Sequence, residues 1–125
     1  MDKGLIFNQN IVTDLKFIGN KALIHTLLIN IINNAIKYNV QGGTIDIYGD
    51  YENESYKIKV SDSGIGMTKE LLEDAFDRFK RGNDEEQGFG LGLAIVQSIA
   101  KFHKIEIGIE SKIDSGTIIT LIFPK

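Results

Sequence analysis

The chain carries apolar residues at helical spacing in two long segments. Residues 21–38 place leucine, isoleucine and alanine every three or four positions, and Asn20 just before them is a suitable N-cap. Residues 91–102 repeat this pattern. A shorter pattern over residues 68–76 begins at Thr68, another good N-cap residue. These three segments are predicted to be helices.

Strict alternation of apolar and polar side chains predicts strands in other segments. It is clear in four segments: 44–51, 56–60, 105–109 and 117–123. Residues 5–18 are predicted to form one or two short strands with a turn at residues 8–10, and residues 53–55 to form a hairpin turn. The order β, α, ββ, α, loop, α, ββ predicts an α/β two-layer sandwich, a mixed sheet with its helices on one face.

The composition is that of one ordinary globular domain, taken as residues 1–125. The chain has 125 residues, 42% hydrophobic and 25% charged, with neither a repeat nor a linker. A net charge of −3 argues against general nucleic-acid binding. The absence of cysteine excludes disulfides, thiolate metal sites and cysteine nucleophiles. No apolar run is long enough to span a bilayer.

Two glycine-rich stretches flank a basic segment in the middle of the chain. The first, SDSGIGM at 61–67, begins where a predicted strand stops, and the second, GFGLGL at 88–93, opens into a helix. The aromatic and basic segment 76–82 lies between them. Glycine lets the backbone approach a phosphate closely, and a helix N-terminus offers free N–H groups with a positive dipole end. The arrangement predicts a nucleotide-binding site.

Four motifs in order carry a family resemblance: HTLLINIINNAIKYN, DSGIGM, FDRFKRG and GFGLGL. They resemble the N, G1, F and G2 boxes of the ATP-binding catalytic domain of sensor histidine kinases. That domain belongs to the GHKL superfamily, together with gyrase, Hsp90 and MutL. The resemblance covers nearly the whole chain. It implies the Bergerat fold, with ATP and Mg²⁺ as cofactors.

The resemblance assigns roles to the end of the first long helix. Asn34 matches the magnesium-binding Asn, whose amide oxygen can complete a shell made mainly of phosphate oxygens and water. Lys37 matches a residue that reaches the phosphates, and Tyr38 one that packs beside the adenine. Asn30 occupies the place of a glutamate that activates water in the gyrase-like branch, and an amide cannot act as a general base. Considered alone, Asn30 and Asn34 could each be a polar residue on a solvated helix face.

The first glycine stretch matches the adenine-binding loop of the family. Asp62 matches the Asp that accepts a hydrogen bond from the exocyclic amine of adenine. Gly64 and Gly66 let the backbone turn beneath the base, and Met67 is expected to line the pocket. The alternative is a solvated turn, because Asp and Gly are common turn residues.

The basic segment and the second glycine stretch match the phosphate side of the family's site. Arg78 and Arg81 are candidates for phosphate binding, although a run of charges can also be a solvated face. The residues that match the G2 box are Gly88, Gly90, Leu91 and Gly92. Phe89 departs from the usual small hydroxyl residue, which affects a side-chain hydrogen bond and not the backbone cradle.

The function implied is that of a protein histidine kinase, with Asn34, Lys37 and Arg78 as the catalytic residues. The γ-phosphoryl group of ATP would pass to a His on a separate dimerisation domain. His25 and His103 lie inside this domain's own predicted elements, and no acceptor helix pair is present. The chain is therefore expected to be a fragment of a longer parent protein.

The expected partners are ATP, the dimerisation and histidine-phosphotransfer domain of the same parent, and a response regulator downstream. We expect a cytoplasmic domain, monomeric alone, without nucleic-acid or direct membrane contact; anchoring of the parent in the inner membrane stays open. The alternatives are an anti-sigma-type serine kinase, a GHKL ATPase used as a conformational clamp, and a degenerate interaction module that has lost ATP.

Overall fold

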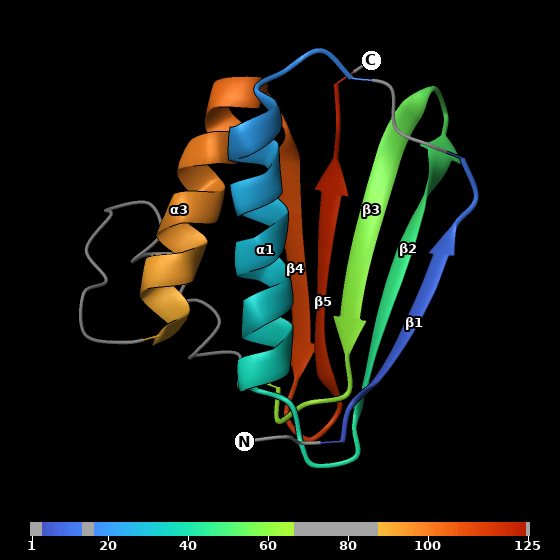
Figure 1. Ribbon diagram of the computed structural model, residues 1–125, viewed down its shortest axis with the longest axis vertical. Coiled ribbons are helices and arrows are strands. Elements are labelled where there is room, and N and C mark those ends of the chain that lie inside the picture. The colour runs from blue at the N-terminus through green and yellow to red at the C-terminus, as the bar shows by residue number, and fades with distance from the viewer. Residues whose placement is uncertain (1–3, 14–16, 67–87, 125) are drawn as a thin grey trace.

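A computed structural model describes residues 4–13, 17–66 and 88–124 as one sheet with two helices on one face (Figure 1). The elements in chain order are β1 (Ile6–Ile11), α1 (Lys21–Lys37), β2 (Thr44–Glu52), β3 (Ser55–Asp62), α3 (Gly88–His103), β4 (Glu106–Lys112) and β5 (Gly116–Ile122). The predicted α/β two-layer sandwich is confirmed. The helix predicted over 68–76 lies outside the described residues.

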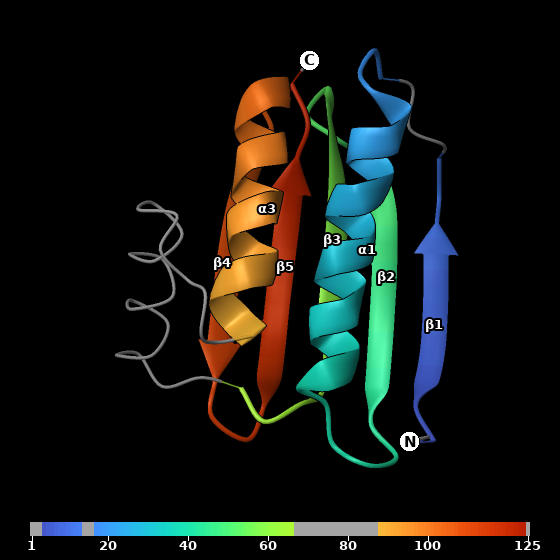
Figure 2. The same cartoon turned by 60° about the vertical axis from the view of Figure 1, so that its left-hand side comes forward.

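The sheet is mixed, with strand order β1-β2-β3-β5-β4. β1 and β2 are parallel, and the other neighbouring pairs are antiparallel. Helix α1 makes the crossover that a parallel pair requires. Figure 2 shows α1 and α3 in front of the sheet, with β1 at an edge that neither helix covers. β3 is the central strand, so its last residue, Asp62, lies between Ile45 of β2 and Thr117 of β5.

The hydrophobic core lies between the helices and the sheet. α1 contributes Leu27, Ile31 and Ala35, each at most 4% exposed, as the helical spacing predicted. The other buried core residues come from the sheet, α3 and the segments beside them: Ile45, Tyr56, Ile58, Val60, Val96, Ile99, Ala100, Ile105, Ile119, Leu121 and Phe123. Full burial of one large aliphatic side chain contributes about 1.5–3 kcal/mol.

The two helices are joined where α1 begins and α3 ends. The side chain of Asn20 accepts a hydrogen bond from the Leu23 N–H at 3.0 Å, which confirms it as the N-cap. The Asn20 N–H in turn donates to Nε2 of His103 at 3.0 Å. Nδ1 of His103 lies 3.0 Å from the Ile99 carbonyl oxygen, to which it can only donate. Both ring nitrogens are therefore engaged, and His103 has a structural role.

The turn predicted at residues 8–10 is wrong. These residues continue β1, which pairs with β2 without interruption from Ile6 to Ile11. The Asn8 side chain donates to Oδ1 of Asp46 at 2.8 Å, so it supports the strand pairing instead of a turn. Pairing with a neighbouring strand has overridden the local preference of Asn for turns.

The second long helix also begins earlier than predicted. The apolar pattern placed its start at Leu91, whereas α3 begins at Gly88 and includes the glycine run. Glycine is a poor helix former, which is why the run suggested a loop. In the structure, however, Gly88–Gly90 form the opening turn of α3. The N–H groups of such a first turn have no intrahelical partner.

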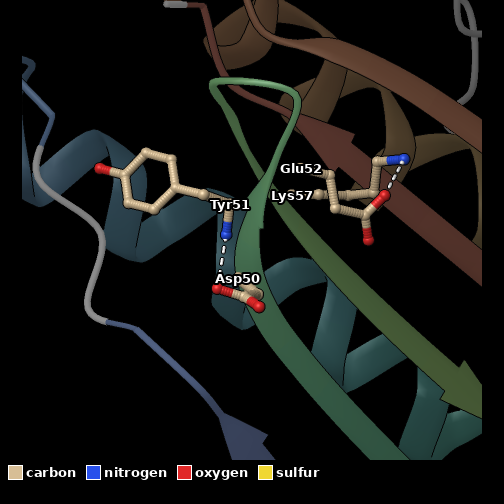
Figure 3. A network of polar contacts seen from close by, with 4 residues as sticks. All are labelled: Asp50, Tyr51, Glu52 and Lys57. Carbon is tan, nitrogen blue, oxygen red and sulfur yellow. Dashed lines mark hydrogen bonds and ion pairs between the residues drawn. The ribbon is translucent and has the colours of Figure 1, made fainter.

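The hairpin between β2 and β3 turns through Asn53 and Glu54, both with positive φ (+54° and +72°). Figure 3 shows two polar contacts beside this turn. Nζ of Lys57 lies 2.9 Å from Oε1 of Glu52, and the carboxylate of Asp50 accepts from the main-chain N–H of the following residue at 2.8 Å. A partly exposed ion pair of this kind contributes at most about 1 kcal/mol.

Among the described residues, no helix is both long enough and apolar enough to cross a membrane.

Candidate nucleotide site

The end of α1 presents the first group of predicted site residues. Asn30, Asn34 and Lys37 are spaced so that they share one side of the helix, and Tyr38 is its C-cap. Asn30 donates its Nδ2 to the Thr26 carbonyl oxygen at 2.8 Å, which fixes the amide along the helix. The ammonium group of Lys37 lies 5.4 Å from the centre of the Tyr38 ring, within cation–π range.

Asn34 has a side-chain nitrogen that is buried without a hydrogen-bond partner among the described residues. A buried, unsatisfied polar atom costs about 1–3 kcal/mol. The oxygen and nitrogen of an amide can exchange places by rotation of the group, so either atom can occupy this buried position. The Asn34 amide is thus a polar group with capacity for a ligand.

The loop after β3 crosses directly beneath the end of α1. The Ile65 N–H donates to the Tyr38 carbonyl oxygen at 3.1 Å, and the Ile65 carbonyl accepts from the Asp114 N–H at 2.8 Å. A Cβ at Gly64 would lie 2.3 Å from the Tyr38 carbonyl oxygen. At Gly66, where φ is +70°, it would lie 1.9 Å from the Lys112 carbonyl oxygen. The two glycines therefore permit this close crossing, whereas their predicted place beneath the base stays a prediction.

Asp62 is held at the start of this loop by main-chain donors. Its Oδ1 accepts from the Gly64 N–H at 2.8 Å and from the Thr117 N–H at 3.2 Å. Both bonds fall on the same oxygen, so within the described residues Oδ2 retains its capacity to accept from a ligand. Burial raises the pKa of Asp62 above its ordinary value, and these two hydrogen bonds oppose the rise.

The structure brings these parts to one end of the molecule. Figure 1 shows the end of α1, the beginning of α3 and the loop after β3 at the end where N is marked. The N-terminus of α3 contributes the positive end of a helix dipole to the same region. A surface hollow of ≈ 490 Å³ at the opposite end of the helices, lined in part by Phe17 and His103, includes no predicted site residue.

Some predicted residues cannot be placed in this geometry. Met67, Arg78 and Arg81 lie outside the described residues. The glycines at 88, 90 and 92 and Leu91 belong to the first turns of α3, at the same end of the molecule as Asp62. Their roles toward a nucleotide stay predictions.

Sequence reasoning missed the residues that hold the loop in place. Asn39, Ser63 and Thr117 were given no role in the site, yet each makes a hydrogen bond that fixes it. Asn39 is 6% exposed and is one of two buried polar residues in the described part of the chain. Its position after the helix end was the one available signal, because Asn at such a place often bonds to nearby backbone.

Comparison with known proteins identifies the class of this site. The family described as histidine kinase-, DNA gyrase B- and HSP90-like ATPases matches residues 19–125. The chain belongs to this family. Within it, the chain has the fold of the ATP-binding catalytic domains of sensor histidine kinases.

The relatives with similar sequences are sensor kinases. The heme sensor protein HssS of Staphylococcus saprophyticus is 36% identical over 124 residues, which are 99% of this chain and 27% of that protein. Sensor histidine kinase YvrG of Bacillus subtilis is 33% identical over 114 residues, 89% of this chain and 20% of that protein. The chain thus spans about a quarter of the length of such relatives.

Solved structures agree with this assignment. The catalytic domain of histidine kinase ThkA superimposes with a TM-score of 0.82 at 27% identity, covering 98% of this chain and 82% of that domain. The mycobacterial sensor histidine kinase MprB, with a TM-score of 0.80, 22% identity and coverage of 97% and 82%, supports the fold alone.

Proposed function

We propose that this chain is the ATP-binding catalytic domain of a sensor histidine kinase. It would hold Mg²⁺·ATP and direct the γ-phosphoryl group toward a histidine on a separate dimerisation domain of the same parent protein. The observation that supports this most strongly is the crossing of the Asp62 loop beneath α1. It brings a carboxylate with a free oxygen to the same end of the molecule as the unsatisfied amide of Asn34.

Asp62 would recognise the adenine base of ATP. Its Oδ2 can accept from the exocyclic amine of adenine, whereas guanine presents a carbonyl at that position and would be rejected. Gly64, Gly66 and Met67 would form the wall beneath the base, and Tyr38 would pack at its side. The phosphates would then extend toward Lys37, the N-terminal turn of α3 and the arginines at 78 and 81.

Asn34 would hold the magnesium ion through its amide oxygen. Among the described residues, no cluster of three acidic or histidine side chains is placed to bind a metal ion by itself. A single neutral oxygen suits Mg²⁺ that already carries phosphate oxygens and waters, and the uncommitted Asn34 amide fits that requirement. The bound ion would neutralise phosphate charge during transfer.

Phosphoryl transfer would rely on positioning and charge stabilisation. The bond between the γ-phosphorus and the β,γ-bridging oxygen breaks, ADP leaves, and a bond to the acceptor imidazole nitrogen forms. Asn30 carries an amide, which cannot remove a proton from water, so hydrolysis is disfavoured. Lys37 and Arg78 would offset the charge of the transferring group.

The partners follow from the proposed reaction. The acceptor histidine must come from another domain, because His103 is engaged at both nitrogens and His25 lies on the body of α1. A response regulator would take the phosphoryl group afterwards. We place this domain in the cytoplasm, where ATP is available. On its own it would be a monomer.

Nucleotide binding by three variants tests the proposal. Asp62→Asn and Asn34→Ala should weaken binding of a non-hydrolysable ATP analogue, whereas Asn8→Ala, a matched loss of a side-chain hydrogen bond on the sheet, should leave it unchanged. Unaltered binding in both site variants would contradict the proposed pocket and favour a degenerate module. Steady-state ATP hydrolysis that disappears in Asn30→Ala would favour the clamp ATPase.

The stability of the phosphorylated product separates the kinases. When the chain acts on its acceptor domain, phosphohistidine is lost in acid and retained in base. An acid-stable product would contradict histidine transfer and point to the serine kinase alternative.

A further inference from the structure

A small polar network joins the end of α1 to the loop that carries Asp62. It consists of Asn39, just after α1, Thr44, the first residue of β2, and Ser63, just after β3. We call these three residues the Asn39–Ser63 latch. They come from three segments of the chain, and Asn39 is 6% exposed although its side chain is fully polar.

Hydrogen bonds connect all three residues of the latch, and Oδ1 of Asn39 also accepts from the Val40 N–H at 2.8 Å. Nδ2 of Asn39 donates to the Thr44 carbonyl oxygen at 3.0 Å. The Thr44 N–H donates to Oγ of Ser63 at 2.8 Å, and the Ser63 hydroxyl donates onward to Oδ1 of Asn39 at 3.3 Å. The Ser63 N–H donates to the Thr44 carbonyl oxygen at 3.1 Å. Each group has the role that its chemistry allows, so the set fixes the orientation of both side chains.

Glycines on both sides of the latch leave the space that its side chains occupy. A Cβ at Gly43 would lie 2.3 Å from Oδ1 of Asn39 and 2.8 Å from Oγ of Ser63. At Gly64 it would lie 3.0 Å from the Asn39 Cα. The requirement at Gly43 is for space, because its φ is not positive. Glycine on both sides lets the latch close directly between the helix end and the loop.

The latch spans the two halves of the nucleotide site. On one side, Asn39 follows the helix end that carries Asn34, Lys37 and Tyr38. On the other, Ser63 follows Asp62 in the chain. A nucleotide that touches Asp62 with its base and Asn34 with its phosphates can use both contacts at full strength only if their separation is fixed in advance.

We infer that Asn39 and Ser63 are positioning residues that set the distance between the adenine contact and the phosphate contacts. This inference rests on the proposed ATP-binding function. Neither residue need touch the nucleotide. Without the latch, the main-chain bond from Ile65 to Tyr38 would still join the loop to the helix end, but their separation would be less restrained. A ligand that spans both halves would then spend part of its binding energy on fixing that separation.

A matched pair of variants at Ser63 tests this role. Ser63→Thr keeps the hydroxyl, and Ser63→Val has nearly the same shape without it. Because a hydrogen bond contributes about 0.5–1.5 kcal/mol net, loss of the two hydroxyl bonds should weaken binding of the ATP analogue by about 5- to 150-fold. Ser63→Thr should stay within about twofold of the wild type. Calorimetric titration is done well below the unfolding midpoint of each protein.

Adenosine provides a second readout. It reaches only the base half of the site, so its affinity should change much less in Ser63→Val than that of the ATP analogue. A merely structural role would lower the unfolding midpoint and leave both affinities of the folded protein unchanged. If Ser63→Val does not fold, Asn39→Asp is used, which keeps the volume and places an oxygen against the Thr44 carbonyl.

The outcomes separate this inference from the proposed function. If the wild type does not bind the ATP analogue, both are wrong. If the wild type binds it and the latch variant binds it equally well, or loses adenosine and ATP analogue alike, the positioning role is overturned and the proposed function stands. A selective loss for the ATP analogue, restored by Ser63→Thr, supports the inference.

Discussion

Replacement of Asp62 by Asn separates two roles that the carboxylate combines. Its Oδ1 accepts from the main-chain N–H groups of Gly64 and Thr117, at 2.8 and 3.2 Å, and an amide oxygen can accept the same two bonds. In Asp62→Asn an NH₂ group, which only donates, replaces the Oδ2 that we propose faces the adenine amine. We therefore expect the variant to fold and to bind ATP poorly.

The loss of affinity can be worked out from the bond that disappears. A hydrogen bond to a charged acceptor contributes about 1.5–3 kcal/mol, and each 1.4 kcal/mol is a tenfold change in dissociation constant. The expected loss is thus roughly 10- to 150-fold. Two donors that face each other in the variant complex favour the upper part of this range.

Although Asp62→Asn should weaken ATP binding, it should make the unliganded protein more stable than the wild type. Burial raises the pKa of Asp62 above its ordinary value of 3.8, against the opposing hydrogen bonds from Gly64 and Thr117. Because the pKa is higher in the folded state, this carboxyl contributes stability below pH 3.8 that is lost as pH rises through the folded-state pKa. Asp62→Asn does not ionise, so its free energy of unfolding should rise relative to wild type across that window.

Denaturant unfolding of both proteins at several pH values, without nucleotide, measures this difference. Titration with the ATP analogue near neutral pH measures the affinity. Wild-type affinity in Asp62→Asn would refute the assignment of Asp62 to adenine. A wild type that gains stability relative to the variant as pH rises through the window would refute burial as the dominant cause of the shift.

Three further substitutions test the fold, and the second of them lies in the loop beside the site. Lys104→Gly should stabilise the chain by about 1 kcal/mol in thermal unfolding, because Lys104, directly after α3, has a φ of +60°; no gain would contradict the strain. Gly66→Ala should cost more than about 2 kcal/mol in denaturant unfolding, because its Cβ would lie 1.9 Å from the Lys112 carbonyl oxygen; a neutral result would contradict that loop path. Glu52→Gln should cost less than about 1 kcal/mol, and high salt should remove even that, because its pair with Lys57 is partly exposed.

Features set by local spacing were predicted well from the sequence. The apolar stripe and the N-cap of α1 and the hairpin after β2 all follow from residues close together in the chain. Periodicity and turn chemistry carry this information directly.

Features set by distant contacts were not predicted. The turn expected at residues 8–10 failed because pairing with β2 keeps that segment extended. The part played by Asn39 depends on Ser63, which lies 24 positions away, and the support of Asp62 by the Thr117 N–H crosses 55 positions. Such contacts exist only once the sheet is assembled, so no local pattern reveals them.

The central claim is that this chain binds Mg²⁺·ATP through Asn34 and Asp62. We would titrate it by calorimetry with a non-hydrolysable ATP analogue, with and without Mg²⁺, in the wild type and in Asn34→Ala. We expect binding that is strengthened by Mg²⁺ in the wild type, with most of that gain lost in Asn34→Ala. No binding at millimolar nucleotide, or the same magnesium dependence in both proteins, would contradict it.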